Sequence, residues 1–83
     1  MASSYWVYIL YSGSRDRYYV GSTGDLEDRL RRHNEGRSQY TRSGAPWELV
    51  HSEGFATRSE AYQRERFIKK KKSRAYIESL IVS

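Results

Sequence analysis

Two short runs rich in tyrosine limit the folds that this chain can adopt. Residues 5–11 read Tyr-Trp-Val-Tyr-Ile-Leu-Tyr, and residues 18–21 read Tyr-Tyr-Val-Gly after a polar loop. The first run is almost wholly apolar or aromatic and rich in strand formers, so we expect a strand that is covered on both faces. The second run pairs with it most simply as a hairpin. Because a buried phenol needs a hydrogen-bond partner, these tyrosines indicate either a wet surface or a functional site.

A helix and a third strand are predicted to follow the hairpin. Leu26, Leu30 and His33 recur at helical spacing after polar residues that can cap a helix, and Gly36 is a good C-terminal stop. Residues 47–53 alternate in hydrophobicity well enough for a half-exposed strand, with a glycine after it. The third strand therefore joins the sheet only after the chain has passed through a helix.

Two more helices complete the predicted fold. Thr57 and Glu60 form a capping box that should begin a helix ending near Lys71, and Ser73 can cap a last short helix. The order of elements is then strand, strand, helix, strand, helix, helix. We expect an α+β fold in which a small, three-stranded, mostly antiparallel sheet is flanked by three helices, and we expect residues 1–83 to form a single domain.

Composition and net charge limit the kinds of molecule that this protein can be expected to bind. The 83 residues include no cysteine, which excludes disulfides and thiolate catalysis and fits a reducing compartment. Lys and Arg number 15 against 10 Asp and Glu, and the formal net charge of +5 favours a polyanion, above all nucleic acid. The longest apolar run is too short to span a bilayer and the N-terminus lacks a signal pattern, so we expect a cytoplasmic protein with no membrane partner.

Two charged residues interrupt the apolar faces of the predicted helices. Glu65 lies on the same helical face as Ala61 and Ile68, and Arg29 lies at the margin of the apolar face of the first helix. A carboxylate among core contacts must be paired, hydrogen-bonded or bound to a cation, because its unpaired burial would be costly. Two explanations are open: a buried salt bridge between Glu65 and Arg29, or a site in which Glu65 binds a divalent metal and Arg29 a phosphate.

Further basic residues are candidates for contacts with a nucleic-acid backbone. They lie in the loop after the first helix and along the second helix: Arg37, Arg42, Arg64, Lys69 and Lys70. A solvated helix face explains those on the second helix equally well, since Lys and Arg also complement a helix C-terminus. If they do contact phosphates, binding should weaken strongly with salt. Tyr40 and Trp47 could stack on bases, although Trp47 fits a core position better.

Four of these segments, taken together, resemble the GIY-YIG nuclease superfamily. Residues 6–8, Trp-Val-Tyr, stand where that family has its first triplet, and residues 19–21, Tyr-Val-Gly, stand where it has its second. Residues 22–34 resemble the family's helix, with its characteristic arginine at Arg29. The segment around Glu65 resembles the one that supplies the metal-binding glutamate.

The resemblance extends from about residue 5 to residue 81 and is greatest to the small single-domain URI-type, or excinuclease-subunit-like, endonucleases. The chain departs from the family pattern in four places. The first triplet lacks its glycine, and the second has Val20 in place of isoleucine. Ser22 and Tyr76 stand where excision-repair members carry a lysine and an asparagine.

The resemblance implies a divalent-metal-dependent endonuclease that hydrolyses phosphodiester bonds in DNA, in the repair or processing of structured DNA. It places one Mg²⁺ or Mn²⁺ ion on Glu65, the scissile phosphate on Arg29, and the attacking water beside Tyr19 with Tyr8 as its hydrogen-bonding partner. His33 is a candidate proton shuttle or phosphate ligand, or else a hydrogen-bonded residue on the helix face. RNA presents the same phosphate and stays open as a substrate, and we expect a monomer or a weak homodimer.

Two other functions stay open on sequence grounds. The basic face alone would suffice for a catalytically silent nucleic-acid-binding module in which the tyrosines are structural. The apolar face of the last helix, residues 77–81, would suit a protein-interaction domain that docks through this helix.

Overall fold

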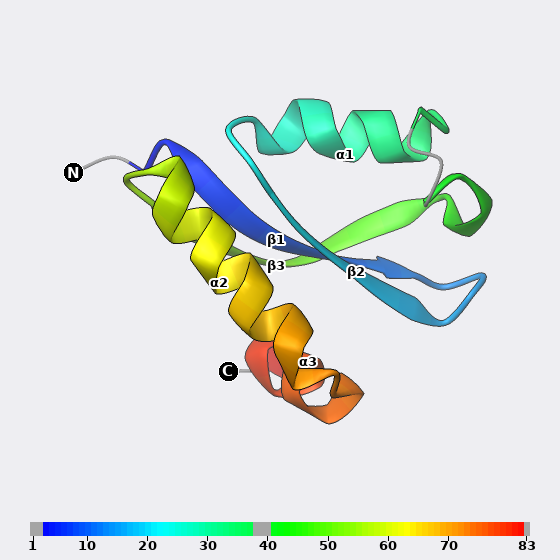
Figure 1. Cartoon of the computed structure of the whole chain (residues 1–83). Coiled ribbons are helices and arrows are strands. Elements are labelled where there is room, and N and C mark those ends of the chain that lie inside the picture. The colour runs from blue at the N-terminus through cyan, green and yellow to red at the C-terminus, as the bar shows by residue number, and fades with distance from the viewer. Residues whose placement is uncertain (1–2, 38–40, 83) are drawn as a thin grey trace.

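A computed structural model of the chain describes residues 3–37 and 41–82 (Figure 1). Its strands are β1 (Tyr5–Ser12), β2 (Arg17–Thr23) and β3 (Trp47–Phe55), and its α-helices are α1 (Leu26–Asn34), α2 (Arg58–Lys71) and α3 (Arg74–Val82). A single 3₁₀ turn, η1 (Arg42–Gly44), precedes β3 in the described part of the chain. The predicted α+β fold and its element order are confirmed. Tyr40, a candidate for base stacking, lies outside the described residues.

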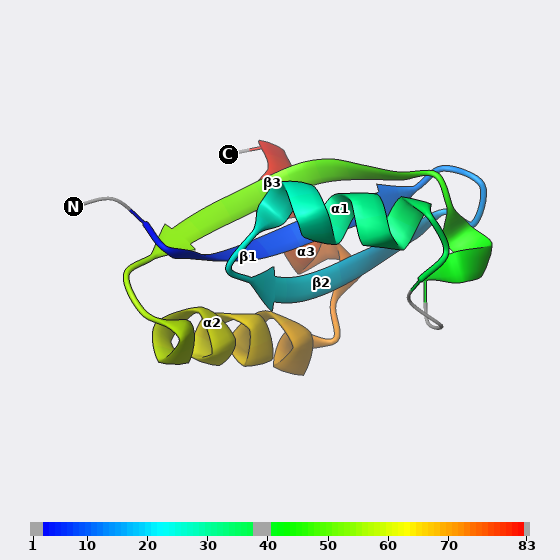
Figure 2. The same cartoon turned by 90° about the horizontal axis from the view of Figure 1, so that it is seen from above.

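The sheet has the order β2-β1-β3, and β1 pairs antiparallel with both neighbours. Because β1 is central, its side chains alternate between two buried layers, as predicted for a strand covered on both faces. One layer holds Val7 and Ile9 and is covered by α2 and α3. The other holds Tyr8 and Leu10 and is covered by α1 (Figures 1 and 2). Figure 2 shows α2 running along the β2 edge of the sheet.

The helix ends agree with the signals in the sequence. Among the several possible caps of α1, Asp25 is the one used, and the predicted Thr57–Glu60 capping box begins α2. Gly36 follows α1 in the left-handed region with a φ of +79°, and the Ser73 hydroxyl accepts a hydrogen bond in the first turn of α3. The prediction placed Gly54 after the third strand, but β3 continues through it to pair with the start of β1. No helix within residues 3–37 and 41–82 is long and apolar enough to cross a bilayer.

Gly21 allows the phenol of Tyr8 to lie against β2. The two residues are opposite each other in the β1–β2 pairing. A Cβ added at Gly21 would meet the Tyr8 hydroxyl oxygen at 2.5 Å and its Cζ at 2.6 Å. Tyr8 is nevertheless buried, with only 2 % of its surface exposed. The glycine therefore provides the space in which the aromatic ring packs.

A series of buried, hydrogen-bonded side chains joins β1 to α1 and to the segment before η1. The Tyr8 hydroxyl lies 3.1 Å from Nε2 of His33, and Nδ1 of His33 lies 2.6 Å from the Thr41 hydroxyl. Both His33 and Thr41 are 1 % exposed, so these contacts satisfy polar groups that water cannot reach. Burial, with a further contribution from the positive charge of Arg29, lowers the pKa of His33. The imidazole is therefore neutral at pH 7.

Substituting Gly21→Ala should destabilise the fold by about 1–3 kcal/mol, because the added methyl group overlaps the Tyr8 ring. Urea unfolding followed by circular dichroism measures this loss. Gly13→Ala is the matched control, since a Cβ at Gly13 meets nothing within 4 Å. Equal stability of the two variants would contradict the packing described here.

Stability should fall as the pH drops through the ordinary range of a histidine. The unfolded chain binds a proton on His33 near pH 6.5, whereas the folded chain, with its lowered pKa, binds it only at more acidic pH. This contribution is therefore complete above that range and is lost below it. Unfolding free energies measured between pH 7.5 and 5 should decline in the parent and in His51→Gln but decline less in His33→Gln. A parallel decline in all three proteins would contradict the assignment.

Candidate active site

Tyr19 lies on the same side of the sheet as the buried Tyr8–His33 pair. Its ring centre is 4.9 Å from that of His33 and 6.2 Å from that of Tyr8. Trp47 closes the cluster on one side at 6.4 Å and donates its ring N–H to the Thr41 carbonyl. Trp47 is 8 % exposed and belongs to the core, which leaves little of its ring for stacking on a base. Tyr19 is only partly buried, so it forms the accessible end of this aromatic cluster.

Glu65 approaches β2 from α2. The Ser22 hydroxyl donates to Oε1 of Glu65 at 2.6 Å, and Nζ of Lys69 lies 2.7 Å from Oε2. The side chain of Glu65 is 14 % exposed, so these two donors compensate most of its desolvation. The structure has no ion pair between Glu65 and Arg29 among its described residues. The hypothesis of a salt bridge between them is therefore wrong: Arg29 stands on α1, and Ser22 and Lys69 already occupy both oxygens of Glu65.

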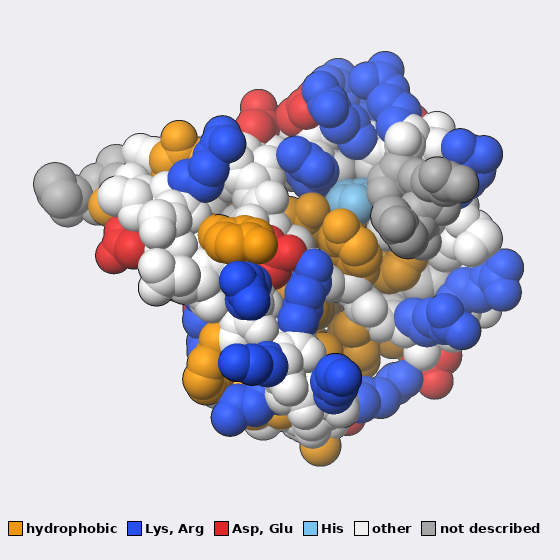
Figure 3. Space-filling model, viewed as in Figure 1, with side chains coloured by type: hydrophobic (Ala, Val, Ile, Leu, Met, Phe, Trp, Pro, Cys, Tyr) orange, Lys and Arg blue, Asp and Glu red, His pale blue; other side chains and the backbone are white. Residues whose placement is uncertain are grey.

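The aromatic cluster of Tyr8, Tyr19 and His33 and the contacts of Glu65 come together at the outer edge of β2. Ser22 directly follows Gly21, on which Tyr8 packs, and Lys69 lies 5.9 Å from the ring centre of Tyr19 while it pairs with Glu65. A continuous set of contacts thus runs from the Tyr8–His33 pair across β2 to Glu65. Figure 3 shows basic side chains over α1 and over α2 on either side of this region, with apolar side chains between them.

Burial and the neighbouring groups keep the Tyr8 hydroxyl protonated. Burial raises the pKa of the Tyr8 hydroxyl well above its ordinary value, the neighbouring Tyr19 and Glu65 add to the rise, and Arg29 opposes it. Tyr8 is therefore a neutral phenol that can donate a hydrogen bond.

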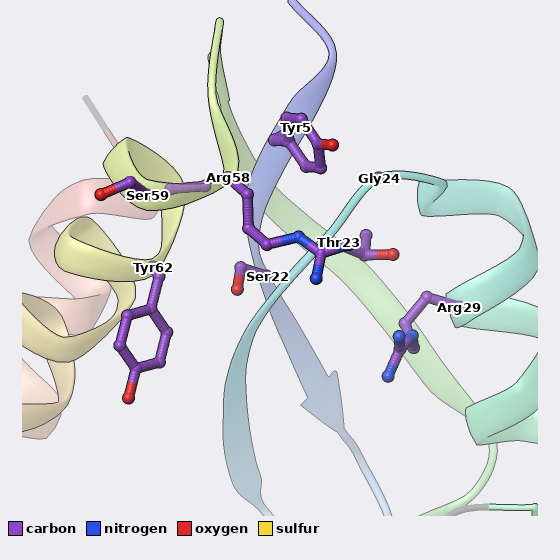
Figure 4. Close-up of a pocket in the computed structure, with 9 residues that line it drawn as sticks. Tyr5, Ser22, Thr23, Gly24, Arg29, Arg58, Ser59 and Tyr62 are labelled. Atoms are coloured by element: carbon purple, nitrogen blue, oxygen red, sulfur yellow. The ribbon is translucent and has the colours of Figure 1, made fainter.

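Arg29 is exposed on α1 and borders a pocket of about 590 Å³ at the end of β2. Its guanidinium group points toward the space between α1 and β2 (Figure 4). It makes no ion pair with any residue that the structure describes. An exposed, unpaired guanidinium group at the rim of a pocket is suited to binding a phosphate through its fork of donors.

The five basic residues that sequence analysis selected for nucleic-acid contacts occupy different environments. Lys69 lies beside Tyr19 and Glu65, and Lys70 is exposed on α2. Arg37 pairs with Glu35 at 3.1 Å, and Arg42 donates to the Gly36 carbonyl at 3.2 Å. These two arginines lie near the end of α1 and remain largely exposed.

Arg64 has partners on the far side of α2. Its Nε and Nη2 donate to the two carboxylate oxygens of Glu53 at 2.8 and 3.1 Å, and Nη1 donates to the Tyr76 hydroxyl at 3.3 Å. The hydrogen bonds from Arg64 hold the pKa of Glu53 below its usual range. This forked pair ties α2 to β3 and α3, which gives Arg64 a structural role that the sequence did not reveal.

The sequence also did not reveal two hydroxyl groups that hydrogen-bond to site residues: that of Ser22, which binds Glu65, and that of Thr41, which binds His33. The sequence presents Ser22 as one of several possible helix caps and as a departure from the excision-repair pattern, yet its hydroxyl donates to Glu65. Its position directly after the second triplet was the available signal. Thr41 binds His33 from a loop eight residues later in the chain, and no local pattern pointed to it.

The donor set fits one weakly held divalent ion. No group of three or more His, Cys, Asp or Glu side chains within the described ranges could enclose a metal. A single carboxylate with open access is nevertheless the usual protein contribution to Mg²⁺ that is shared with substrate phosphates. Both oxygens of Glu65 accept hydrogen bonds, from Ser22 and from Lys69, so an ion would have to displace Lys69, whose side chain is half exposed and long enough to move aside.

The chain is similar to known proteins over most of its length. The GIY-YIG catalytic domain matches residues 4–77. A UPF0213 protein of Bacillus velezensis is 42 % identical over 80 residues, which cover 92 % of this chain and 80 % of that protein. A UPF0213 protein of Natronomonas pharaonis is 43 % identical over 82 residues, covering 98 % and 94 %.

The structural comparison leads to the same group. The solution NMR structure of the UPF0213 protein BH0048 from Bacillus halodurans superposes with a TM-score of 0.59 at 33 % identity, covering 94 % of this chain and 82 % of that one. The resemblance inferred from the tyrosine triplets, the helix and the glutamate segment is thus confirmed. The chain belongs to the GIY-YIG nuclease family.

Proposed function

We propose that this protein is an endonuclease that hydrolyses phosphodiester bonds in DNA with the help of one Mg²⁺ or Mn²⁺ ion. The observation that carries the proposal is the continuous set of contacts that joins the tyrosines of the sheet to Glu65 across the edge of β2. Membership of a family of nucleases that are generally metal-dependent supports it. By resemblance to the excision-repair members, we place the activity in the repair or processing of structured DNA.

The reaction makes three demands on a site. A water molecule must attack the phosphorus and lose a proton, negative charge grows on the phosphate oxygens, and the departing oxygen must be stabilised. Arg29 is exposed and has no ion-pair partner among the described residues, so it is free to bind the non-bridging oxygens. In this role it would act mainly in the transition state, where the charge is greatest.

Glu65 would hold the divalent ion, with water and substrate phosphate as the other ligands. Such an ion, when bound, supplies positive charge that stabilises the phosphate oxygens and the leaving group. Ser22 fixes one carboxylate oxygen of Glu65 and thereby orients the group. We assign Ser22 as a positioning residue, in the same way that outer hydrogen bonds orient the ligands of many metal sites.

Tyr19 is our candidate to orient or deprotonate the attacking water. It is the more accessible of the two site tyrosines and lies between His33 and Lys69. Tyr8, with its raised pKa, serves as a hydrogen-bonding partner. His33 has both ring nitrogens engaged and is almost fully buried, so we assign it the positioning of Tyr8 in preference to proton transfer.

Contacts with the flanking backbone are assigned to the exposed basic residues. Lys69 and Lys70 are exposed on α2, and Arg37 and Arg42 are exposed beyond the end of α1. Arg64 is omitted from this set because Glu53 already pairs with it. Since these contacts are with phosphates, they give little sequence preference and a strong dependence on salt.

Substitution of the central residues should abolish or greatly slow cleavage without unfolding the protein. Glu65→Gln should remove divalent-dependent nicking of supercoiled plasmid and of branched DNA, and Tyr19→Phe and Arg29→Ala should slow it by about 100-fold or more. Gel assays with Mg²⁺ or Mn²⁺ measure the rates, and circular dichroism verifies the fold.

Glu48→Gln is the matched control, because Glu48 is an exposed carboxylate on β3. It should cut like the parent protein. Cleavage by Glu65→Gln at the parental rate would refute the site. Salt-sensitive binding without any divalent-dependent cleavage by the parent would instead favour a catalytically silent binding module.

A further inference from the structure

The pocket beside Arg29 extends away from the tyrosine cluster toward the start of α2. It occupies about 590 Å³ between the end of β2, α1 and the first turns of α2, a size typical of small-ligand sites. Figure 4 shows Arg29 reaching into this space from α1 and Arg58 reaching across it from α2. Ser22 and Thr23 also line the pocket, whereas the hydroxyl of Ser59 points away from it (Figure 4).

The charge of the pocket favours an anion. None of the described residues that line it is acidic. Arg29 and Arg58 make no ion pair within the described part of the chain, whereas Arg31, Arg32, Arg37, Arg64 and Arg74 each pair with a carboxylate there. Arg58 instead lies over the ring of Tyr5 at 5.7 Å from its centre. Two unneutralised guanidinium groups therefore converge on one cavity.

An exposed aromatic ring also lines this pocket. Tyr62 is 51 % exposed, although the first helical turns of α2 bury Ala61 beside it. Its ring is not part of either core cluster, and the guanidinium group of Arg66 lies 5.7 Å from its centre. An exposed ring among cations is typical of sites where a nucleic-acid base stacks.

We propose that this pocket binds one nucleotide of the substrate strand, next to the scissile phosphate. Arg58 holds the phosphate of that nucleotide, and Tyr62 stacks on its base. The inference rests on the proposed function, because it takes Arg29 as the ligand of the scissile phosphate. Since a base can reach Tyr62 only when it has left the double-helical stack, the pocket selects strands with an unpaired nucleotide at the cleavage site.

Binding measured without cleavage tests the pocket directly. In the Glu65→Gln background, fluorescence anisotropy gives the affinity for labelled single strands of DNA and of RNA and for a blunt DNA duplex. Arg58→Ala and Tyr62→Leu should each weaken single-strand binding by about tenfold and duplex binding by less than about twofold, as expected for the loss of one stacked base or one phosphate contact. Tyr62→Phe, which keeps the ring, should bind like the Glu65→Gln parent.

The control Arg31→Ala removes the same charge from the far side of α1 and should change both affinities little. A strand carrying 2-aminopurine should lose fluorescence on binding the parent and lose less on binding Tyr62→Leu, because stacking quenches the base. Equal losses for single strand and duplex, or losses no larger than those of Arg31→Ala, would overturn the proposal.

The outcome separates this proposal from the nuclease assignment. If Glu65-dependent cleavage is found but Arg58→Ala and Tyr62→Leu bind like the parent, the pocket assignment fails and the nuclease assignment stands. If the single-strand losses appear but no cleavage depends on Glu65, the pocket stands as a binding site and the nuclease assignment fails. The tighter of the DNA and RNA strands identifies the natural form of the nucleotide.

Discussion

The contact on which the site depends is the packing of the Tyr8 phenol against Gly21. It brings a hydroxyl from the central strand across to the edge strand, where it meets Nε2 of His33 on α1. Thr41 in turn contacts Nδ1 of His33 and holds the imidazole in place. A side chain at position 21 would overlap the Tyr8 ring and displace it, and the polar groups arranged around β2 would shift with it. The glycine of the second triplet is thus explained by space, since its backbone needs no left-handed conformation.

Near the Tyr8 phenol, the fold keeps the negative charge of Glu65 and the positive charge of Arg29 from forming an ion pair. Glu65 is held by Ser22 and Lys69, while Arg29 stays unpaired on the other side of β2. Had the two formed the salt bridge that their positions in the helices suggested, neither could bind a metal or a phosphate. The separation by β2 leaves Arg29 without an ion pair among the described residues and leaves Glu65 paired with Lys69, whose side chain is half exposed. The same separation creates the pocket between Arg29 and Arg58.

Much of the fold followed from local rules. The apolar run of β1, the capping box at Thr57 and the cap at Ser73 each rest on neighbouring residues, so the sequence alone predicted them correctly. For α1 the sequence offered several caps, and the structure uses Asp25. The site was predictable only in outline. Glu65 and Arg29 were visible because each interrupted an apolar face, and their roles came from the family resemblance.

What could not be predicted depends on contacts between distant segments. The hydrogen bond from Ser22 to Glu65 spans 43 residues, and the pairing of Arg64 with Glu53 spans 11 residues and two elements. Both are set by how α2 lies along the sheet, which no local pattern encodes. For the same reason Arg64 could not be distinguished from its exposed neighbours Lys69 and Lys70 by sequence.

The proposed nuclease activity requires a divalent ion at Glu65, beside the edge of β2. Titration of ¹⁵N-labelled protein with Mn²⁺ tests it most directly, because the paramagnetic ion broadens the amide signals nearest to it. Signals of Gly21, Ser22 and Glu65 should broaden first, and Glu65→Gln should abolish this effect while leaving the rest of the spectrum intact. Broadening could instead centre on the acidic first turn of α1, at Asp25 and Asp28, and stay unchanged in Glu65→Gln. That result would contradict a divalent-ion site at Glu65.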